Sequence, residues 1–255
     1  MRQSSTAPPV MSLLATRSTF LACAFMLTTS AHAALHMLTD ENAPFGYTDP
    51  ASQKITGITA EMVIEAARRA KQPYVLEIFP WARAYSLAKN DPDTCVYPLV
   101  RLPERESQFQ WIGPLSVNTW VLYAKTSFPG KVSSLADLEK YVIGGLLQDG
   151  PSMYLKSQGI KIDLVGDNKH NLKKLAAGRI DLWATGLHRG RALAAEEGIT
   201  DIKPIYTLKE VDHYLACSPK TAESAVKALN QAVDTMRSDG WMKKIGEHYQ
   251  SAVAK

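Results

Sequence analysis

The chain has 255 residues, with 29 lysines and arginines against 25 acidic residues, so its formal net charge is +4. A balance this close to neutral argues against a nucleic-acid partner and against polybasic attachment to a membrane surface. The length is sufficient to bury a sizeable core, as one large domain or as two smaller ones.

Residues 1–33 have the features of a secretory signal peptide. Arg2 and Arg17 are the only charged residues of this segment, and an apolar run follows them at 20–27. Ala31-His32-Ala33 fits a cleavage site, and the run is shorter than the roughly 20 apolar residues that span a membrane. We therefore expect cleavage after Ala33 and a mature chain in the periplasm.

Two other interpretations of this segment stay open. The apolar run also fits a buried core helix, and Phe20-Leu21-Ala22-Cys23 loosely resembles a lipoprotein cleavage site. We favour the signal peptide because too few apolar residues precede Cys23 and because the apolar run continues past it. Its removal takes away two bases, which leaves 27 bases against 25 acids and a net charge of +2.

Strand-like and helix-like segments alternate from Leu35 onward. Short apolar or alternating runs predict strands at 35–38, 74–79 and 95–100, and helical spacing of apolar residues predicts helices at 58–70 and 81–88. Pro80 fits the first turn of the second helix. This order of strand, helix, strand, helix and strand predicts a mainly parallel sheet.

The alternation resumes after Pro114. Strands are predicted at 118–124, 141–147, 162–165, 180–184, 202–208 and 211–217, and helices at 152–158, 168–177, 187–196, 222–237 and 240–249, with a short one opening at Ser133. No long polar linker separates these segments. Two lobes would therefore be joined directly by strands that cross between them.

Cys95 and Cys217 are the cysteines of the predicted mature chain. An oxidising compartment favours a disulfide between them. Each also lies in an apolar, strand-like run, so two separate buried thiols are the other interpretation, and the sequence leaves both open. Histidine and cysteine do not recur at the spacing of metal ligands, and we expect neither a metal nor a cofactor.

Short motifs follow one another in a characteristic order. They are Asn42-Ala43-Pro44-Phe45-Gly46-Tyr47, Gly57-Ile58-Thr59-Ala60-Glu61, Phe79-Pro80-Trp81-Ala82-Arg83, Pro103-Glu104-Arg105, the stretch 109–114, Leu135-Ala136-Asp137-Leu138, Ala177-Gly178-Arg179-Ile180-Asp181 and Ser238-Asp239-Gly240-Trp241. Each is weak alone. Together they make the mature chain resemble the extracellular solute-binding proteins of family 3, the periplasmic receptors of polar amino-acid uptake systems.

The resemblance implies an α/β fold of the periplasmic-binding-protein-like type II class. Two α/β lobes are joined by two crossing segments, with a ligand cleft between them that closes by a hinge motion. We place lobe 1 at 34–117 plus 214–255 and lobe 2 at 118–213. The resemblance also implies a monomer that binds a small molecule and serves an inner-membrane ABC permease, and that is not an enzyme.

The resemblance assigns the central ligand contact to Arg105, the arginine of Pro-Glu-Arg, which grips the ligand carboxylate in the family. A guanidinium offers a planar pair of donors that matches a carboxylate. The segment 149–152 opens a helix after a strand, so the backbone at Gly150 and the hydroxyl of Ser152 are candidate anion contacts. Ordinary helix capping explains the same residues and is compatible with that role.

Further candidates lie where strands end, which is where such sheets bind ligands. Trp81, Phe45 and Asn42 lie in or near loops after strands, and Tyr97 precedes Pro98 at the end of another. Trp183 and Thr185 end the strand that Asp181 opens. Packing within a lobe is the competing role for Phe45 and for Trp183, and Asp181 is expected to fasten its turn.

The chain departs from the family in one respect that concerns the ligand. Amino-acid binders of the family carry an acid a few residues beyond the Gly-Arg-Ile-Asp turn, which pairs the ligand ammonium. Counting from Asp181 reaches Thr185, Gly186 and Leu187, with no acid. Because a buried ammonium without a partner is costly, the sequence predicts a carboxylate ligand without an α-ammonium, with an aromatic body suggested by Trp81 and Trp183.

Two other classes of function share this fold. A cyclohexadienyl-dehydratase-like enzyme needs a carboxylic acid in the cleft, for which Glu41 is the nearest candidate. A binding protein can also report to a membrane sensor instead of a transporter. The sequence favours the transport receptor over the enzyme and does not separate it from the sensor partner.

Overall fold

The computed structural model describes Met1, Ser4 and residues 33–253, with side-chain surroundings up to Tyr249. The predicted signal peptide and its alternatives, including the site at Cys23, lie almost entirely outside these residues. Among the described residues, no helix combines the length and the apolar character needed to cross a membrane.

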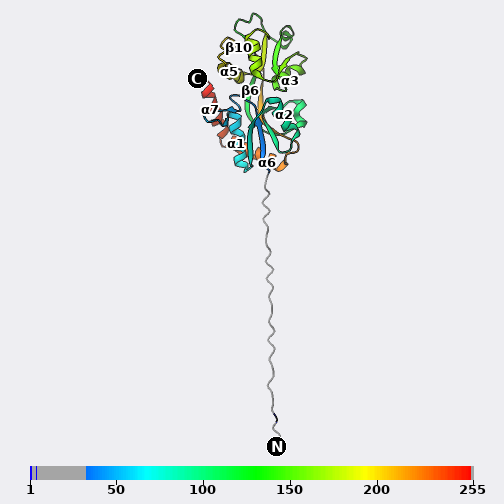
Figure 1. Ribbon diagram of the computed structural model, residues 1–255, viewed down its shortest axis with the longest axis vertical. Helices are drawn as coiled ribbons and strands as arrows, with labels where there is room; N and C mark the ends of the chain where they lie inside the picture. The colour runs from blue at the N-terminus through cyan, green and yellow to red at the C-terminus, as the bar shows by residue number, and fades with distance from the viewer. Residues whose placement is uncertain (2–3, 5–32, 254–255) are drawn as a thin grey trace. The chain divides into compact units, whose positions relative to one another are not determined.

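One eight-stranded sheet organises the structure, with the strand order β4-β1-β5-β10-β6-β9-β7-β8 (Figure 1). Its strands are β1 (Leu35–Thr39), β4 (Tyr74–Ile78), β5 (Thr94–Val100), β6 (Gln110–Lys125), β7 (Ile143–Leu146), β8 (Asp163–Val165), β9 (Leu182–Gly186) and β10 (Ile202–Cys217), and a small separate pair is formed by β2 (Tyr47–Thr48) and β3 (Ile55–Thr56). β1 pairs in parallel with β4 and β5, and β7 pairs in parallel with β8 and β9. The predicted parallel pairing is therefore confirmed within each lobe.

Seven α-helices and two short 3₁₀ segments are described around these strands. They are α1 (Ile58–Ala70), α2 (Trp81–Asn90), α3 (Gly150–Ser157), α4 (Asn168–Ala176), α5 (Leu187–Glu196), α6 (Glu223–Ser238) and α7 (Trp241–Val253), with η1 (Pro103–Gln108) and η2 (Leu135–Lys140). The short helix expected at Ser133 is the 3₁₀ segment η2, whose capping box is formed by Ser134 and Asp137. The remaining helices lie within a few residues of their predicted positions.

The two longest strands, β6 and β10, pair antiparallel from Ile202 opposite Lys125 to Cys217 opposite Gln110. Two predictions were wrong here: the strand expected at 118–124 begins at Gln110, and the strands expected at 202–208 and 211–217 are one. Register shifts near Lys209 interrupt the side-chain pattern without ending the pairing, so the sequence looks like two strands.

The predicted lobe boundaries fall within these two strands, where Val117 pairs with Asp212 and Asn118 with Val211. The boundaries themselves stay a prediction. We keep the names lobe 1 (34–117 and 214–253) and lobe 2 (118–213) for the two parts of the described chain.

Each lobe buries both faces of its part of the sheet, because side chains alternate along the strands. In lobe 1, Met37 faces α1 and α6, whereas Leu38 faces α2. In lobe 2, Leu182 packs with Leu155 of α3, whereas its neighbour Trp183 packs with Leu172 of α4 on the opposite face. The helices thus cover both sides of the sheet, as the alternation of strands and helices predicts.

A disulfide joins Cys95 of β5 to Cys217 of β10, which are directly opposite each other in the antiparallel register. This resolves the alternative that the sequence left open. Both cysteines are fully buried in the core cluster between the sheet and α1 and α6. The bond closes a loop with a sequence separation of 122 residues, which includes the whole of lobe 2.

We expect the double variant Cys95→Ala/Cys217→Ala to lose about 2–5 kcal/mol of unfolding free energy, because the unfolded chain is no longer constrained. Urea unfolding measures this loss. The wild type treated with a reductant should lose a similar amount, and the double variant should not respond to it. Equal stability of the oxidised and reduced wild type would contradict a structural role for the bond.

Candidate functional site

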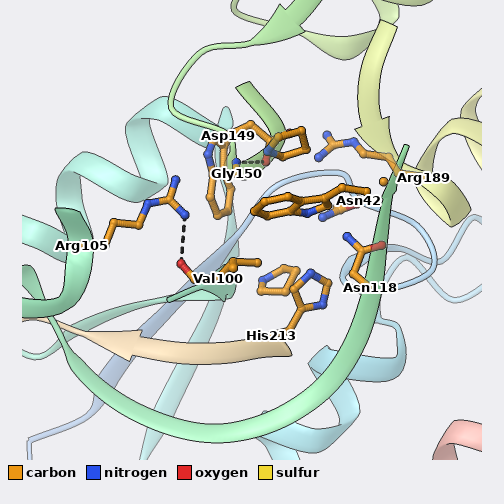
Figure 2. Close-up of a pocket in the computed structure, with 13 residues that line it drawn as sticks. Asn42, Val100, Arg105, Asn118, Asp149, Gly150, Arg189 and His213 are labelled. Atoms are coloured by element: carbon orange, nitrogen blue, oxygen red, sulfur yellow. Dashed lines mark hydrogen bonds between the residues drawn. The ribbon is translucent and has the colours of Figure 1, made fainter. Parts of the chain in front are cut away.

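A small cavity lies where strands from both lobes end, with a volume of about 30 Å³ (Figure 2). Its lining comes from the loop after β1, the ends of β5 and β9, the starts of α2, α3 and α5, the segment η1 and the crossing strands β6 and β10. The lining residues are Asn42, Trp81, Pro98, Val100, Arg105, Asn118, Trp120, Asp149, Gly150, Pro151, Gly186, Arg189 and His213. Open α/β sheets bind ligands at such strand ends. The cavity therefore lies at the strand ends where the sequence analysis placed the candidate site.

The volume describes a closed state. About 30 Å³ accommodates one or two water molecules and no organic acid. A more open hollow of about 380 Å³ adjoins it and shares Trp81 and Arg189, with an apolar wall that includes Phe79 and Pro80. An organic acid would therefore need more space than this arrangement of the lobes provides.

Arg105 is 1 % exposed and lies in the cavity wall. Its Nη1 donates to the carbonyl oxygen of Val100 at 3.1 Å and its Nη2 to that of Gln148 at 2.6 Å, while its Nε has no hydrogen-bond partner. Its guanidinium also lies 5.3 Å from the ring centre of Tyr85. Burial lowers the pKa of Arg105. Within the described residues this cation has carbonyl acceptors and no ion pair, an arrangement that favours an anionic partner.

The carbonyl of Gln148 connects the lobes at this point. It accepts from Nη2 of Arg105 and, at 3.0 Å, from Nε1 of Trp81, both in lobe 1. Gln148 has a φ of 62°, a left-handed conformation that is uncommon for a residue with a side chain. The turn before α3 thus presents an acceptor to both donors in the closed state.

A second polar contact between the lobes joins Arg189 of α5 to Asp40, which directly follows β1. Nη2 of Arg189 donates to Oδ2 of Asp40 at 2.6 Å, and both side chains are largely buried. The other carboxylate oxygen of Asp40 has no partner. This ion pair joins a cation of one lobe to an acid of the other, and the sequence analysis did not connect the two residues.

The start of α3 is capped by a side chain of the protein itself. Oδ1 of Asp149 accepts from the backbone N–H of Gly150 at 2.8 Å, and Pro151 has no N–H to offer. Burial raises the pKa of the Asp149 carboxyl, which the charge of Arg189 offsets in part. The side chain of Asp149 already occupies the N–H of Gly150, as the helix-capping interpretation expects, and the anion contact of Gly150 stays a prediction.

Two side-chain amides line the cavity without a hydrogen-bond partner for their oxygens. Asn42 lies in the loop after β1, and Asn118 lies on β6. Figure 2 shows both on the side of the cavity near Arg189, opposite Arg105. Amides can donate and accept, so this wall offers polar partners that the closed protein leaves unused.

Four predicted residues line the cavity: Arg105, Trp81, Asn42 and Gly150. The others are fully buried elsewhere. Tyr97 faces the core of lobe 1 beside Cys95, where burial raises its pKa. Phe45 packs edge-on against the ring of His213, with centroids 4.5 Å apart, so it supports a cavity residue without lining the cavity.

The lobe 2 predictions fail because of the side on which each residue lies. Trp183 is fully buried with α4, where its Nε1 donates to Oδ1 of Asn168 at 3.1 Å, and Thr185 lies on the same face of β9. The hydroxyl of Ser152 faces β7, only 2.3 Å from where a side chain on Gly145 would begin. Asp181 fastens its turn as expected, accepting from the N–H of Val142 at 2.8 Å.

The sequence analysis assigned no role in the site to Asp40, Asn118, Trp120, Arg189 or His213. Asp40 follows β1 directly, so the rule of strand ends could have found it. The others depend on the pairing of β6 with β10 and on the approach of α5 to lobe 1. Neither is visible in local sequence.

We expect Gly150→Ala to destabilise the protein by about 1–3 kcal/mol, because overpacking has costs of this size. A Cβ at this position would lie 2.3 Å from the Trp120 ring. Gly166→Ala is the matched control, since a Cβ there meets nothing within 4 Å. Urea unfolding of both variants is the measurement, and equal losses would contradict the close packing of α3 on Trp120.

The burial of His213 predicts that the stability of the protein depends on pH. Burial lowers its pKa to about 3, against about 6.5 in the unfolded chain, so its contribution is complete above pH 6.5 and is lost as the pH falls from 6.5 towards 3. We expect the unfolding free energy to decrease between pH 7 and pH 5, by up to about 1.4 kcal/mol per pH unit from this group at the acidic end. His213→Gln should reduce that slope, and an unchanged slope in this variant would contradict the prediction.

Comparison with known proteins adds to this geometry. Residues 35–252 match the bacterial extracellular solute-binding proteins, family 3. The L-cystine-binding protein TcyA of Bacillus subtilis (strain 168) is 20% identical over 206 residues, which cover 81% of this chain and 76% of TcyA.

Two solved structures with low sequence identity share the fold. A histidine kinase sensor domain with similarity to periplasmic binding proteins superposes with a TM-score of 0.78 at 16% identity, covering 86% of this chain and 96% of that chain. The arginine-, lysine-, histidine-binding protein ArtJ from Geobacillus stearothermophilus superposes with a TM-score of 0.74 at 16% identity, covering 85% and 95%. The resemblance that the sequence motifs indicated is confirmed, and the chain belongs to the bacterial extracellular solute-binding proteins of family 3.

Proposed function

We propose that this chain is a periplasmic receptor that captures a small carboxylate-bearing molecule between its lobes and delivers it to an ABC permease. The observation that carries the proposal is Arg105, a buried guanidinium in the cavity wall that is held by carbonyl oxygens and has an unpartnered Nε. A buried cation without an acid is costly unless an anion binds beside it. A ligand carboxylate supplies that anion.

Hinge closure explains how such a ligand reaches a cavity this small. Opening the lobes would break the contacts of Gln148 with Arg105 and Trp81, and the ion pair of Asp40 with Arg189. Nη2 of Arg105 is then available for a ligand carboxylate, which is a stronger acceptor than the neutral carbonyl of Gln148. Closing around the ligand would restore the ion pair of Asp40 with Arg189, while the ligand carboxylate takes the place of the Gln148 carbonyl at Nη2 of Arg105.

The cargo that we propose is an acid without an α-ammonium. Gly186 lies in the cavity wall in the segment where the family's amino-acid binders carry an acid. The two carboxylates nearby each have a partner within the protein at one oxygen, Asp40 with Arg189 and Asp149 with the N–H of Gly150. TcyA and ArtJ are named as binding amino acids. On this proposal the present chain differs from them at the amine end.

The apolar part of the ligand is inferred from the tryptophans that line the cavity. Trp183 no longer supports an aromatic ligand, because it is buried on the opposite face of β9. Trp81 and Trp120 line the cavity instead, and Trp81 also borders the adjoining hollow. These indoles favour an acid with a flat apolar portion.

The sensor role and the enzyme role share this fold. The fold of the histidine kinase sensor domain suits either a transport or a signalling receptor, so the partner distinguishes them. Glu41, the acid considered for catalysis, accepts from both the backbone N–H and the hydroxyl of Thr48, which occupies both of its oxygens in the loop after β1. We therefore retain the transport receptor as the proposal.

A thermal-shift screen of the mature chain against aliphatic acids, aromatic acids and the standard amino acids tests the carboxylate site. We expect an acid at a hundredfold excess over its dissociation constant to stabilise the protein by about 2.7 kcal/mol. Arg105→Ala should abolish the shift, measured against that variant's own ligand-free melting temperature. Arg68→Ala, which removes an exposed arginine paired with Glu65 on α1, should retain it. A shift that survives Arg105→Ala would exclude Arg105 as the carboxylate ligand.

Calorimetry separates the cargo from ordinary amino acids. Because both carboxylates near the amine end already have a partner within the protein, we expect the acid identified by the screen to bind more tightly than the L-amino acid with the same side chain. Micromolar or tighter binding of a standard L-amino acid would contradict the proposed cargo while leaving the receptor function intact.

A further inference from the structure

His213 lines the cavity and is held by a chain of two hydroxyl groups. Its Nδ1 lies 3.1 Å from Oγ of Ser116, which lies 2.9 Å from Oγ1 of Thr59, and all three side chains are buried. The ring of Phe45 packs edge-on against the imidazole with centroids 4.5 Å apart. These contacts fix the ring between the crossing strands and the loop after β1.

The hydroxyl chain determines which nitrogen of His213 carries the proton. Within the described residues, Ser116 is the only hydrogen-bond partner of the Thr59 hydroxyl, so the Thr59 hydrogen has an acceptor only at Oγ of Ser116. Ser116 must then donate its own hydrogen to Nδ1 of His213. The reverse direction leaves a buried hydroxyl hydrogen without an acceptor, which is unfavourable. Nδ1 is therefore the acceptor, and Nε2 carries the hydrogen.

The Nε2–H group is unused within the protein. Nε2 makes no hydrogen bond in the described part of the chain, while His213 lines the cavity. Figure 2 shows the His213 ring directed towards the centre of the cavity residues, on the same side as Asn118.

We propose that His213 is a ligand-binding residue whose Nε2–H donates a hydrogen bond to an oxygen of the bound acid. This inference rests on the proposed function and deepens it, because it adds a second anchoring point beside Arg105. The closed cavity then offers a charged donor at one wall and a neutral donor at its floor. The partner of the neutral donor is an acceptor oxygen, which is the second oxygen of the same carboxylate or a further oxygen function of the ligand.

The surroundings of the ring suit a neutral donor. Phe45 and Ser116 contact it, and burial is the sole cause that lowers its pKa, to about 3. The imidazole thus remains uncharged at neutral pH. An uncharged N–H group can donate to a hydroxyl, keto or carboxylate oxygen without requiring a second negative charge on the ligand.

Nitrogen NMR of the full mature chain with ¹⁵N-labelled histidine tests the tautomer without any ligand. At pH 7 we expect His213 to show a protonated Nε2 and an unprotonated Nδ1. A protonated Nδ1 with a bare Nε2, or a doubly protonated ring, would overturn the proposal. His36, which is exposed and paired with Glu77, serves as the reference histidine.

A titration with sodium acetate at constant ionic strength, balanced with sodium chloride, then tests the contact in uniformly ¹⁵N-labelled protein. Acetate is a small carboxylate that needs little space beside Arg105. We expect saturable shifts of both the Arg105 Nε and the His213 Nε2 resonances. A shift at Arg105 alone would refute the role of His213 and keep the proposed function, whereas no shift at either would count against both.

The variant Ser116→Ala removes the donor to Nδ1 and keeps the ring. We expect the Nδ1–H tautomer of His213 to become populated and the affinity for acetate to fall about three- to tenfold, the loss of one neutral hydrogen bond. Ser218→Ala is the matched control, because that serine is also buried, directly follows β10 outside the cavity lining, and accepts from the N–H of Lys220 at its hydroxyl oxygen. An unchanged tautomer in Ser116→Ala would show that the hydroxyl chain does not set it.

Discussion

The antiparallel pairing of β6 with β10 is the constraint on which the structure depends. The two strands run side by side from Ile202 opposite Lys125 to Cys217 opposite Gln110, and they are the only strands of the described chain that belong to both lobes. β5 attaches to one end of this ribbon and β9 to the other. The ends of these strands therefore meet near its middle, and the cavity between the lobes forms there.

The chemistry of that cavity follows from burying charge where the lobes meet. Arg105 donates to the carbonyl oxygens of Val100 and Gln148, and Gln148 belongs to the opposite lobe. Asp40 and Arg189 form the second link between the lobes. The contact thus matches the polar groups of the two lobes against each other and leaves Arg105 without an acid in the described part of the chain. This connects the hinge to the proposed binding of an anion.

Periodicity predicted the elements well because apolar spacing reports on burial within a segment. Periodicity did not predict the orientation of a side chain where that orientation depends on which face of a strand packs against which helix. Trp183 and Ser152 were correctly placed near strand and helix ends, yet alternation turns both towards the interior of lobe 2. The break near Lys209 gave the impression of two strands, because a register shift disturbs the side-chain pattern while the backbone pairing continues.

The sequence by itself determined the fold class and the family, and it singled out Arg105 as a candidate site residue, because motif order and hydrophobic periodicity are local properties of the chain. Only the tertiary structure decided the disulfide of Cys95 with Cys217, the pair of Asp40 with Arg189 and the contact of Ser116 with His213. These partners are 122, 149 and 97 positions apart. Such contacts depend on strand register and on how the lobes close, which no single segment of sequence encodes.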